Sequence, residues 1–242
     1  MNLAVDIGNT RVKVAVFKED KLVDFVVFEK KIIISEIKKI AKKYIISVGI
    51  ISNVASVSEK KMIQLKKIIN FHVISHESQI PFINLYKTPK TLGIDRIALV
   101  AAAVKQYPNK NVLIIDAGTC ITFDFVNTKK EYLGGAISPG IKLRYKSLNA
   151  FTANLPLISN LELENLTGKN TYESIVSGVL NGVVAEIDGL IFRYKQKYLD
   201  LTVVLTGGDT NFLSKQLKSS IFATQNFVLQ GLNEILKLNA HK

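Results

Sequence analysis

The stretch Val5-Asp6-Ile7-Gly8-Asn9-Thr10 is followed 110 residues later by Ile115-Asp116-Ala117-Gly118-Thr119-Cys120. In each stretch an apolar strand ends in Asp-x-Gly and a polar residue, and the chain turns directly into a second strand. Asp and Gly favour turns in general, so one such hairpin would carry little information. Two of them, each opening three strands and a helix, indicate an internal duplication. We therefore expect an α/β protein of two domains, residues 1–110 and 111–242.

Apolar periodicity and turn residues predict the elements of each half. In the first half we expect strands over 3–7, 12–17 and 22–28, a helix over 35–44, a strand over 45–51, a helix over 58–69, a strand over 71–74, a loop over 81–92 and a helix over 93–103. In the second half we expect strands over 112–115, 120–126 and 132–137, helices from about 140 and over 171–198, a strand over 201–205, a helix from 210, a short strand near 221 and a helix over 228–238.

The composition is that of a globular protein. Of the 242 residues, 48% are hydrophobic and 21% are charged, so the chain can bury a core. A single Cys excludes a disulfide framework and a Cys-based zinc site and indicates a reducing compartment. No uncharged apolar run approaches the roughly 20 residues of a membrane span. Asp6 also lies inside the first apolar run, which a secretory signal would not contain. We expect a cytoplasmic protein without a membrane partner.

The chain is strongly basic, with 32 basic and 20 acidic residues and a formal net charge of +12. Such a charge is compatible with nucleic acid, a membrane surface or small polyanionic ligands. The basic residues are spread in pairs, such as Lys38-Lys39 and Lys66-Lys67, on what we interpret as solvent faces of helices. The sequence has no long run of like charges and no alternation of basic and aromatic residues. We therefore expect no nucleic-acid partner.

The duplicated hairpins carry the chemistry of an anion site. A glycine at the tip lets backbone N–H groups approach a phosphate closely, and Asn9, Thr10 and Thr119 add side-chain donors. Arg11 and Lys13 alternate along one strand, so they share a face and add positive charge. Each Asp at a strand end is better suited to hold a cation that bridges to phosphate oxygens. Two such hairpins facing one another would hold a polyphosphate from both sides.

A later glycine pair, Thr206-Gly207-Gly208-Asp209, lies between a predicted strand and a helix. Its glycines permit flat packing, which suits a contact near a nucleoside. A simple strand-to-helix turn with Asp209 as the helix cap explains the same residues, and the motif alone does not decide between the two.

Together these motifs resemble the actin-like ATPase and sugar-kinase superfamily, whose members have two ribonuclease-H-like domains with a nucleotide cleft between them. Within it, the chain is similar to the type III pantothenate kinases from residue 1 to about 235, in order and without a missing block. The matching segments are Asp6-Ile-Gly-Asn-Thr-Arg-Val-Lys13, Gly93-Ile-Asp-Arg96, Asp116-Ala-Gly-Thr-Cys-Ile-Thr-Phe-Asp124, Gly134-Gly-Ala-Ile-Ser-Pro-Gly140, Gly168-Lys-Asn-Thr171 and Thr206-Gly-Gly-Asp209.

The resemblance implies ATP-dependent phosphorylation of pantothenate, the first step of coenzyme A synthesis, by a homodimer that uses Mg²⁺ and a monovalent cation. It implies that Asp116 holds K⁺ or NH₄⁺, that Asp95 is the base, and that Arg96 faces the substrate carboxylate. The residues implied to bind ATP are Asp6, Ile7, Gly8, Asn9, Thr10, Arg11, Val12, Lys13 and Thr119. Those implied to bind pantothenate are Tyr86, Gly93, Ile94, Asp95, Arg96 and Thr171.

The residue types at 95 and 96 support this assignment. A lone Asp at a helix start most often interacts only with the helix dipole. Arg96 beside it changes the interpretation, because a guanidinium binds a carboxylate through two hydrogen bonds. Pantothenate requires both functions, since it carries a carboxylate to recognise and a primary hydroxyl to deprotonate.

Two alternatives remain for the whole chain: a regulator of the same fold that has lost its chemistry and binds nucleotide or DNA, and a kinase of the same fold for another small alcohol. Other candidate sites are weaker. His72 and His76 lack a third ligand for zinc, and Cys120 is interpreted as a small buried residue. The apolar stripe Ile175, Val179, Gly182, Val183 and Ile187 is either core or a dimer seam.

Overall fold

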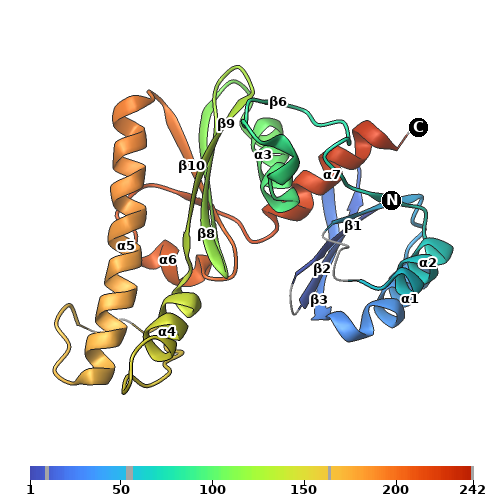
Figure 1. Cartoon of the computed structure of the whole chain (residues 1–242). Coiled ribbons are helices and arrows are strands. Elements are labelled where there is room, and N and C mark those ends of the chain that lie inside the picture. The colour runs from blue at the N-terminus through green and yellow to red at the C-terminus, as the bar shows by residue number, and fades with distance from the viewer. Residues whose placement is uncertain (9–10, 53–56, 163–164, 241–242) are drawn as a thin grey trace. The chain divides into compact units, whose positions relative to one another are not determined.

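The computed structural model describes residues 1–8, 11–52, 57–162 and 165–240, which fold into two compact units (Figure 1). Unit 1 comprises residues 1–108, 129–132 and 226–242, and unit 2 comprises residues 109–128 and 133–225. This division departs from the predicted boundary near residue 110 in two segments, because residues 129–132 and the last helix of the chain pack with the first half.

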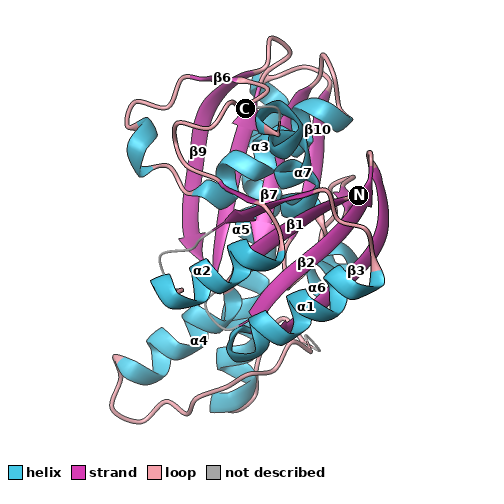
Figure 2. Ribbon diagram, turned by 90° about the vertical axis from the view of Figure 1, so that its right-hand side faces the viewer, coloured by secondary structure: helices cyan, strands magenta, loops and turns pink. Residues whose placement is uncertain are grey.

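The sheet of unit 1 has the strand order β3-β2-β1-β4-β5. β1 pairs antiparallel with β2 and β2 with β3 (Figure 2). β4 pairs parallel with β1, and β5 pairs parallel with β4. The strands span Asn2–Ile7, Arg11–Lys18, Lys21–Glu29, Val48–Ser52 and Phe71–Val73 for β1 to β5. The hairpin of β1 and β2 turns at Gly8, which places the first Asp-x-Gly motif at the end of the central strand of the sheet.

One face of this sheet is covered by α1 (Ile33–Lys43) and α2 (Glu59–Ile68), which contact one another. A short 3-10 helix, η1 (Lys30–Ile32), precedes α1. Isoleucines of α1 at helical spacing pack onto alternate residues of β1 and β2, as the amphipathic pattern predicts. The residues of this core include Leu3, Val5, Val12, Val14, Ile33, Ile37, Ile40 and Leu65.

Two further helices of unit 1, α3 (Ile94–Gln106) and α7 (Phe227–Asn239), pack against each other, and α7 also contacts β1, β2 and β4. The helices approach closely because Gly231 lacks a side chain. A Cβ at this position would lie 1.7 Å from the backbone oxygen of Ala98. This close packing is why the last helix belongs to unit 1.

The predicted loop over 81–92 contains two short elements, β6 (Ile83–Asn84) and the 3-10 helix η3 (Pro89–Thr91). β6 pairs parallel with the beginning of β9 (Glu131–Pro139), where Asn84 lies opposite Tyr132. A two-residue strand has no periodicity of its own, so the sequence pattern gave no sign of it.

The sheet of unit 2 repeats the order of the first sheet. Its strands lie in the order β11-β10-β7-β8-β9, with β6 next to β9. In both sheets the first three strands form a meander and the fourth strand pairs parallel with the first, which confirms the internal duplication. The remaining strands are β7 (Asn111–Ala117), β8 (Cys120–Val126), β10 (Leu201–Thr206) and β11 (Phe222–Ala223).

The helices in the described residues of unit 2 are α4 (Ile141–Ala150), α5 (Thr171–Lys197) and α6 (Thr210–Gln216). The long α5, drawn in orange, contacts β10 (Figure 1). Its residues Ile175, Val179, Val183 and Ile187 are core residues. Gly182 is exposed instead, and a Cβ there would meet nothing within 4 Å. The stripe that the sequence left ambiguous is therefore core, and the glycines lie on another face.

By length and composition alone, α5 is the helix in the described part of the chain that could cross a membrane. Two of its charged residues have partners within unit 2. Glu186 forms an ion pair with Arg144 of α4, and Asp188 accepts the backbone N–H groups of Lys218 and Ser219, both at 3.2 Å. Together with its buried face, these contacts make α5 the central packing helix of unit 2.

Candidate active site

The first hairpin places opposite charges on one face of unit 1. Asp6, near the end of β1, lies directly opposite Lys13 of β2, and residues in such a cross-strand pair share a face. Ser52, at the end of β4, donates its hydroxyl to Oδ1 of Asp6 at 2.7 Å. The N–H of Gly8 donates to the oxygen of Arg11 at 2.9 Å and closes the turn. The sequence pattern did not indicate Ser52 as a site residue, because the predicted strand ended one residue before it.

The other residues expected to bind ATP in this loop differ in whether their side chains are accessible to a ligand. Ile7 and Val12 are buried, at 2% and 0% exposed, so their side chains belong to the core and only their backbone is available to a ligand. Arg11 is exposed and Lys13 half-buried, on the opposite face from Val12 as predicted. Asn9 and Thr10 lie outside the described residues.

The start of α3 brings several predicted substrate residues together. Gly93 is the N-cap residue, and Ile94 and Asp95 are half-buried. Oδ1 of Asp95 accepts the backbone N–H of Arg96 at 2.9 Å. A Cβ at Gly93 would lie 2.3 Å from this same oxygen. The carboxylate therefore turns back over Gly93, close to the positive end of the helix dipole.

Arg96 is almost fully buried, at 5% exposed. Its guanidinium carbon lies 5.6 Å from the centre of the Tyr86 ring, within the range of a cation–π contact. Tyr86 comes from the segment after β6, so the fold joins a residue of the predicted loop to the start of α3. Burial of a guanidinium restricts its orientation, which suits a residue that recognises one anionic group.

His76 binds the backbone of Leu92, the residue just before Gly93. Its Nε2 lies 2.8 Å from the backbone oxygen of Leu92, and since a carbonyl only accepts, the ring nitrogen donates. His72 contacts the hydroxyl of Ser78 at 2.9 Å, and burial lowers the pKa of its imidazole. Among the described residues no group of three possible metal ligands includes either histidine.

The second hairpin lies in unit 2. Asp116 of β7 lies opposite Thr122 of β8. The N–H of Gly118 donates to the oxygen of Cys120 at 2.9 Å, two residues on, whereas Gly8 at the first hairpin bonds three residues on. Thr119 is exposed at the tip. The expectation that Cys120 is buried is wrong, because the thiol is exposed. Ile121 is fully buried, and strand alternation turns the residue before it to the other face.

The Thr-Gly-Gly-Asp motif packs directly onto this hairpin. Gly207 has a φ of +99°, and a Cβ there would lie 2.3 Å from the oxygen of Ala117 and 2.5 Å from Oδ1 of Asp116. The N–H of Asp209 donates to the oxygen of Ala117 at 3.0 Å. Only glycine combines this backbone conformation with so close an approach.

Gly140 packs against the tip of the second hairpin. Its N–H donates to the oxygen of Thr119 at 3.0 Å, and a Cβ there would lie 2.1 Å from the oxygen of Gly118. Asp209 is the N-cap residue of α6 by position, but its carboxylate makes no cap hydrogen bond to any described residue. Burial raises the pKa of this carboxyl, and the charge of Lys142 opposes the shift. The second hairpin, the turn at Gly207 and the segment at Gly140 thus meet near Asp116.

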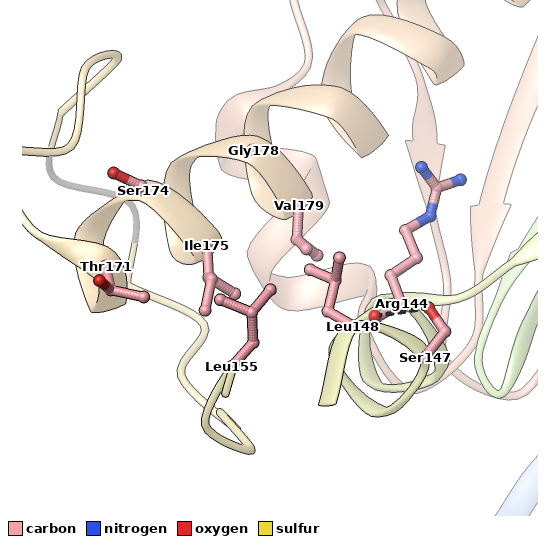
Figure 3. Close-up of a pocket in the computed structure, with 9 residues that line it drawn as sticks. All are labelled: Arg144, Ser147, Leu148, Leu155, Thr171, Ser174, Ile175, Gly178 and Val179. Carbon is pink, nitrogen blue, oxygen red and sulfur yellow. Dashed lines mark hydrogen bonds between the residues drawn. The ribbon is translucent and has the colours of Figure 1, made fainter. Parts of the chain in front are cut away.

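Thr171, the first residue of α5, is also in unit 2 and is exposed. It lies at the edge of a hollow of about 670 Å³ between α4 and α5 (Figure 3). Apolar side chains of Leu148, Ile175 and Val179 line its centre. In unit 1 the structure therefore brings Tyr86 to the segment of Gly93, Ile94, Asp95 and Arg96. In unit 2, Asp116 and Thr119 lie in the second hairpin, whereas Thr171 lies apart from them in sequence, at the start of α5. The nucleotide cleft expected between the two halves stays a prediction.

A model of the type III pantothenate kinases matches residues 2–193. The chain belongs to this family. A type III pantothenate kinase of Christiangramia forsetii is 50% identical over 240 residues, which cover 99% of each chain. One from Flavobacterium johnsoniae is 46% identical over 235 residues, covering 97% of this chain and 96% of the relative. The assignment confirms the prediction of an enzyme, a kinase that phosphorylates pantothenate at the start of coenzyme A synthesis.

Solved structures confirm the fold class of this pantothenate kinase. A Baf family protein of Campylobacter jejuni is similar with a TM-score of 0.63 and 22% identity, covering 99% of this chain and all of that one. A ROK hexokinase from Thermus thermophilus is similar with a TM-score of 0.53 and 12% identity, covering 98% of both chains. At these identities the likeness shows the α/β fold of tandem ribonuclease-H-like domains and nothing more.

Proposed function

We propose that Asp95 is the general base of the pantothenate kinase reaction and that Arg96 recognises the carboxylate of pantothenate. The observation that carries this proposal is the arrangement at the start of α3. There the buried guanidinium of Arg96 lies against Tyr86, and the carboxylate of Asp95 occupies the space left by Gly93. These two neighbouring side chains match two functional groups of pantothenate, a carboxylate to bind and a hydroxyl to deprotonate.

Phosphoryl transfer passes through a loose transition state, so positioning and charge neutralisation dominate catalysis. Asp95 orients the substrate hydroxyl and takes its proton late in the reaction. Arg96 holds the other end of the substrate and contributes to binding in the ground and transition states alike. Gly93 and Ile94 bring the backbone near the substrate, and Tyr86 forms a wall of the same site.

We propose that ATP binds through the two Asp-x-Gly hairpins. Lys13 supplies a positive charge to the phosphates, the backbone approaches them at Gly8, and Thr119 adds a hydroxyl at the second hairpin. Mg²⁺ neutralises charge on the phosphate oxygens when ATP is bound. Asp6, fixed by the hydroxyl of Ser52, is suited to orient water molecules around this ion.

We propose a monovalent cation, K⁺ or NH₄⁺, at Asp116. The carboxylate lies on the surface where three loops meet, which makes oxygen ligands plentiful. Thr122, opposite Asp116 in the ladder, has a buried hydroxyl oxygen without a hydrogen bond to any described residue. A buried hydroxyl oxygen of this kind is a suitable ligand for a hard cation such as K⁺. Such an ion would reduce repulsion between the carboxylate and the phosphates of ATP.

We also propose a cytoplasmic homodimer without a nucleic-acid or membrane partner. The exposed face of α5 supports the dimer, since Gly178, Gly182 and Gly189 leave open space for close approach of another helix. Large apolar side chains are exposed on the same unit, including Ile137 at 64% and Phe192 at 60%. An apolar surface of this kind is typical of a surface that contacts a partner.

A coupled ADP-release assay over a panel of small alcohols tests the substrate. We expect ADP release with pantothenate in the presence of Mg²⁺ and K⁺, and little with sugars, glycerol or pantothenol, which lacks the carboxylate. Preference for pantothenol would remove the role of Arg96. Preference for a sugar would overturn the assignment of pantothenate as the substrate.

A further inference from the structure

Three aromatic rings of unit 1 follow one another toward Arg96. The ring of Phe82 meets the ring of Tyr132 edge to face, with centres 6.1 Å apart and planes at 73°. The ring of Tyr86 stacks on Tyr132, with centres 6.0 Å apart and planes at 27°. Both geometries are favourable for aromatic pairs. Tyr132 therefore lies between two residues of the segment that leads to the substrate site.

Backbone hydrogen bonds hold this segment beside Tyr132. The N–H of Ile83 donates to the oxygen of Lys130 at 2.9 Å, and the N–H of Leu85 donates to the oxygen of Tyr132 at 3.0 Å. The N–H of Tyr86 donates to Oδ1 of Asn84 at 3.0 Å, which closes a local turn. The position of Tyr86 is thus set by its pairing with β9, which begins 45 residues later in the chain.

Tyr132 is fully buried, at 0% exposed, so it is shielded from solvent and from a dissolved substrate. Tyr86 is half-buried, and Arg96 lies 5.6 Å from the centre of its ring. A guanidinium that packs on an aromatic ring loses this orientation when the ring is free to turn. The stack on Tyr132 restrains the Tyr86 ring.

We propose that Tyr132 is a positioning residue for pantothenate recognition. Its ring holds Tyr86 in place, and Tyr86 in turn holds the guanidinium of Arg96 toward the substrate carboxylate. The inference rests on the proposed role of Arg96 and extends it to a buried residue of β9 that the sequence motifs did not include. It predicts a specific effect on pantothenate, because the ATP residues proposed above lie on other elements.

The test compares Tyr132→Leu, which removes the ring, with Tyr132→Phe, which retains it. For Tyr132→Leu we expect the KM for pantothenate to rise roughly 3- to 10-fold, the effect of losing one aromatic contact. We expect the KM for ATP and kcat to stay within about twofold, and Tyr132→Phe to restore the KM for pantothenate. The dissociation constant for pantothenate, measured by calorimetry, should change in parallel.

Phe82→Leu is a milder change at the other side of the same ring, and it serves if Tyr132→Leu fails to fold. It should raise the KM for pantothenate in the same direction by a smaller factor. Equal losses for ATP and pantothenate, or a lowered melting temperature with unchanged KM values, would overturn the positioning role.

Arg96→Ala separates this inference from the role on which it rests. If Arg96→Ala leaves the KM for pantothenate unchanged, the proposed role of Arg96 is wrong, and the inference falls with it. If Arg96→Ala raises that KM while Tyr132→Leu does not, only the inference about Tyr132 is wrong. The double variant with Tyr132→Leu and Arg96→Ala should add nothing to the effect of Arg96→Ala alone, because both changes act on one contact.

Discussion

The carboxylate of Asp95 occupies the space that a side chain at Gly93 would need, since a Cβ at position 93 would lie 2.3 Å from Oδ1. The φ of Gly93 is −57°, a value open to any residue. Glycine is therefore required here for the placement of its neighbour and not for the backbone conformation. Stability and activity should respond differently to a change at this position.

Gly93→Ala should leave the fold nearly unchanged, because the end of the Asp95 side chain can rotate away from the added methyl group. The displaced carboxylate should lower kcat/KM for pantothenate by about 10²-fold, the effect of misplacing a reacting group. Steady-state kinetics and thermal melting measure the two quantities. Lys38→Ala, at an exposed position of α1, is the control and should retain activity. A large drop in melting temperature with Gly93→Ala would contradict this reasoning.

Asp95→Asn keeps the shape of the side chain and removes the proton acceptor. We expect kcat to fall by about 10² to 10⁴, with the KM for ATP and the melting temperature near the wild-type values. Asp200→Asn, at an exposed turn, is the matched control. If kcat of Asp95→Asn stays within a few-fold of wild type, the base lies elsewhere, and Asp6 would be the next carboxylate to test.

Asp116→Asn should weaken the response to monovalent cations. The wild-type enzyme should be slow in Na⁺ or Tris buffers and faster with K⁺ or NH₄⁺. Loss of the carboxylate charge should reduce this activation and raise the KM for ATP by roughly tenfold. Initial rates over a K⁺ titration measure the effect, again with Asp200→Asn as control. Equal activity of the wild type in all four buffers would exclude the cation role.

Gly182→Leu should separate the proposed dimer without unfolding the chain. A Cβ at this position would meet no described atom within 4 Å in the single chain, whereas a leucine side chain would obstruct a partner helix. We expect the dimer dissociation constant to rise roughly tenfold or more, as for an overpacked interface, measured by sedimentation equilibrium. Lys195→Leu, exposed near the end of α5, is the control. An unchanged dimer would place the interface on another surface.

Asp24 links β3 to the end of α1. It accepts hydrogen bonds from Nζ of Lys43 and from the hydroxyl of Tyr44, both at 2.8 Å, and these bonds lower the pKa of its carboxyl. A lowered pKa in the folded state gives stability that is present above the usual pKa and lost as the pH falls through the folded value.

Asp24→Asn should therefore lower the melting temperature at pH 7 by about 3 °C or less, as for a partly exposed ion pair. The difference from wild type should shrink between about pH 5 and pH 2. Thermal melts over this range measure it. Glu29→Gln, which removes the exposed ion pair with Lys31, is the control and should have little effect at any pH. A constant difference over the whole range would mean that the link is not electrostatic.

Local patterns were sufficient to predict most of the fold. The strand that contains Asp6 and the helix after Gly93 were predicted close to their observed limits. Each is a mainly apolar run that is followed by a turn residue, Gly8 after the strand and Pro108 after the helix. Cys120 is exposed at the first position of β8, beside the hairpin, whereas Asp124 on the same face of the strand is fully buried. Cysteine as a residue type tends to be buried, but its place next to the turn decides its exposure here.

The features that the sequence did not reveal depend on long-range pairing. β6 is recognisable only by its bonds to β9, and the hydrogen bond from Ser52 to Asp6 requires two strands distant in sequence to lie in register. Tyr132 is one buried aromatic among many until its stack on Tyr86 is known. Motifs identify residues that touch ligands, whereas the residues that support them follow from tertiary contacts.

The packing of α7 on α3 has a consequence for the order in which the protein is built on the ribosome. Domains generally fold as units while the chain is being synthesised, the N-terminal one first. Here unit 1 is completed by a helix that emerges after all of unit 2, so the apolar surface of α3 that receives Gly231 stays uncovered during most of translation. Unit 2, almost continuous in sequence, can close first. The first half of the polypeptide is thus the last to reach its final structure.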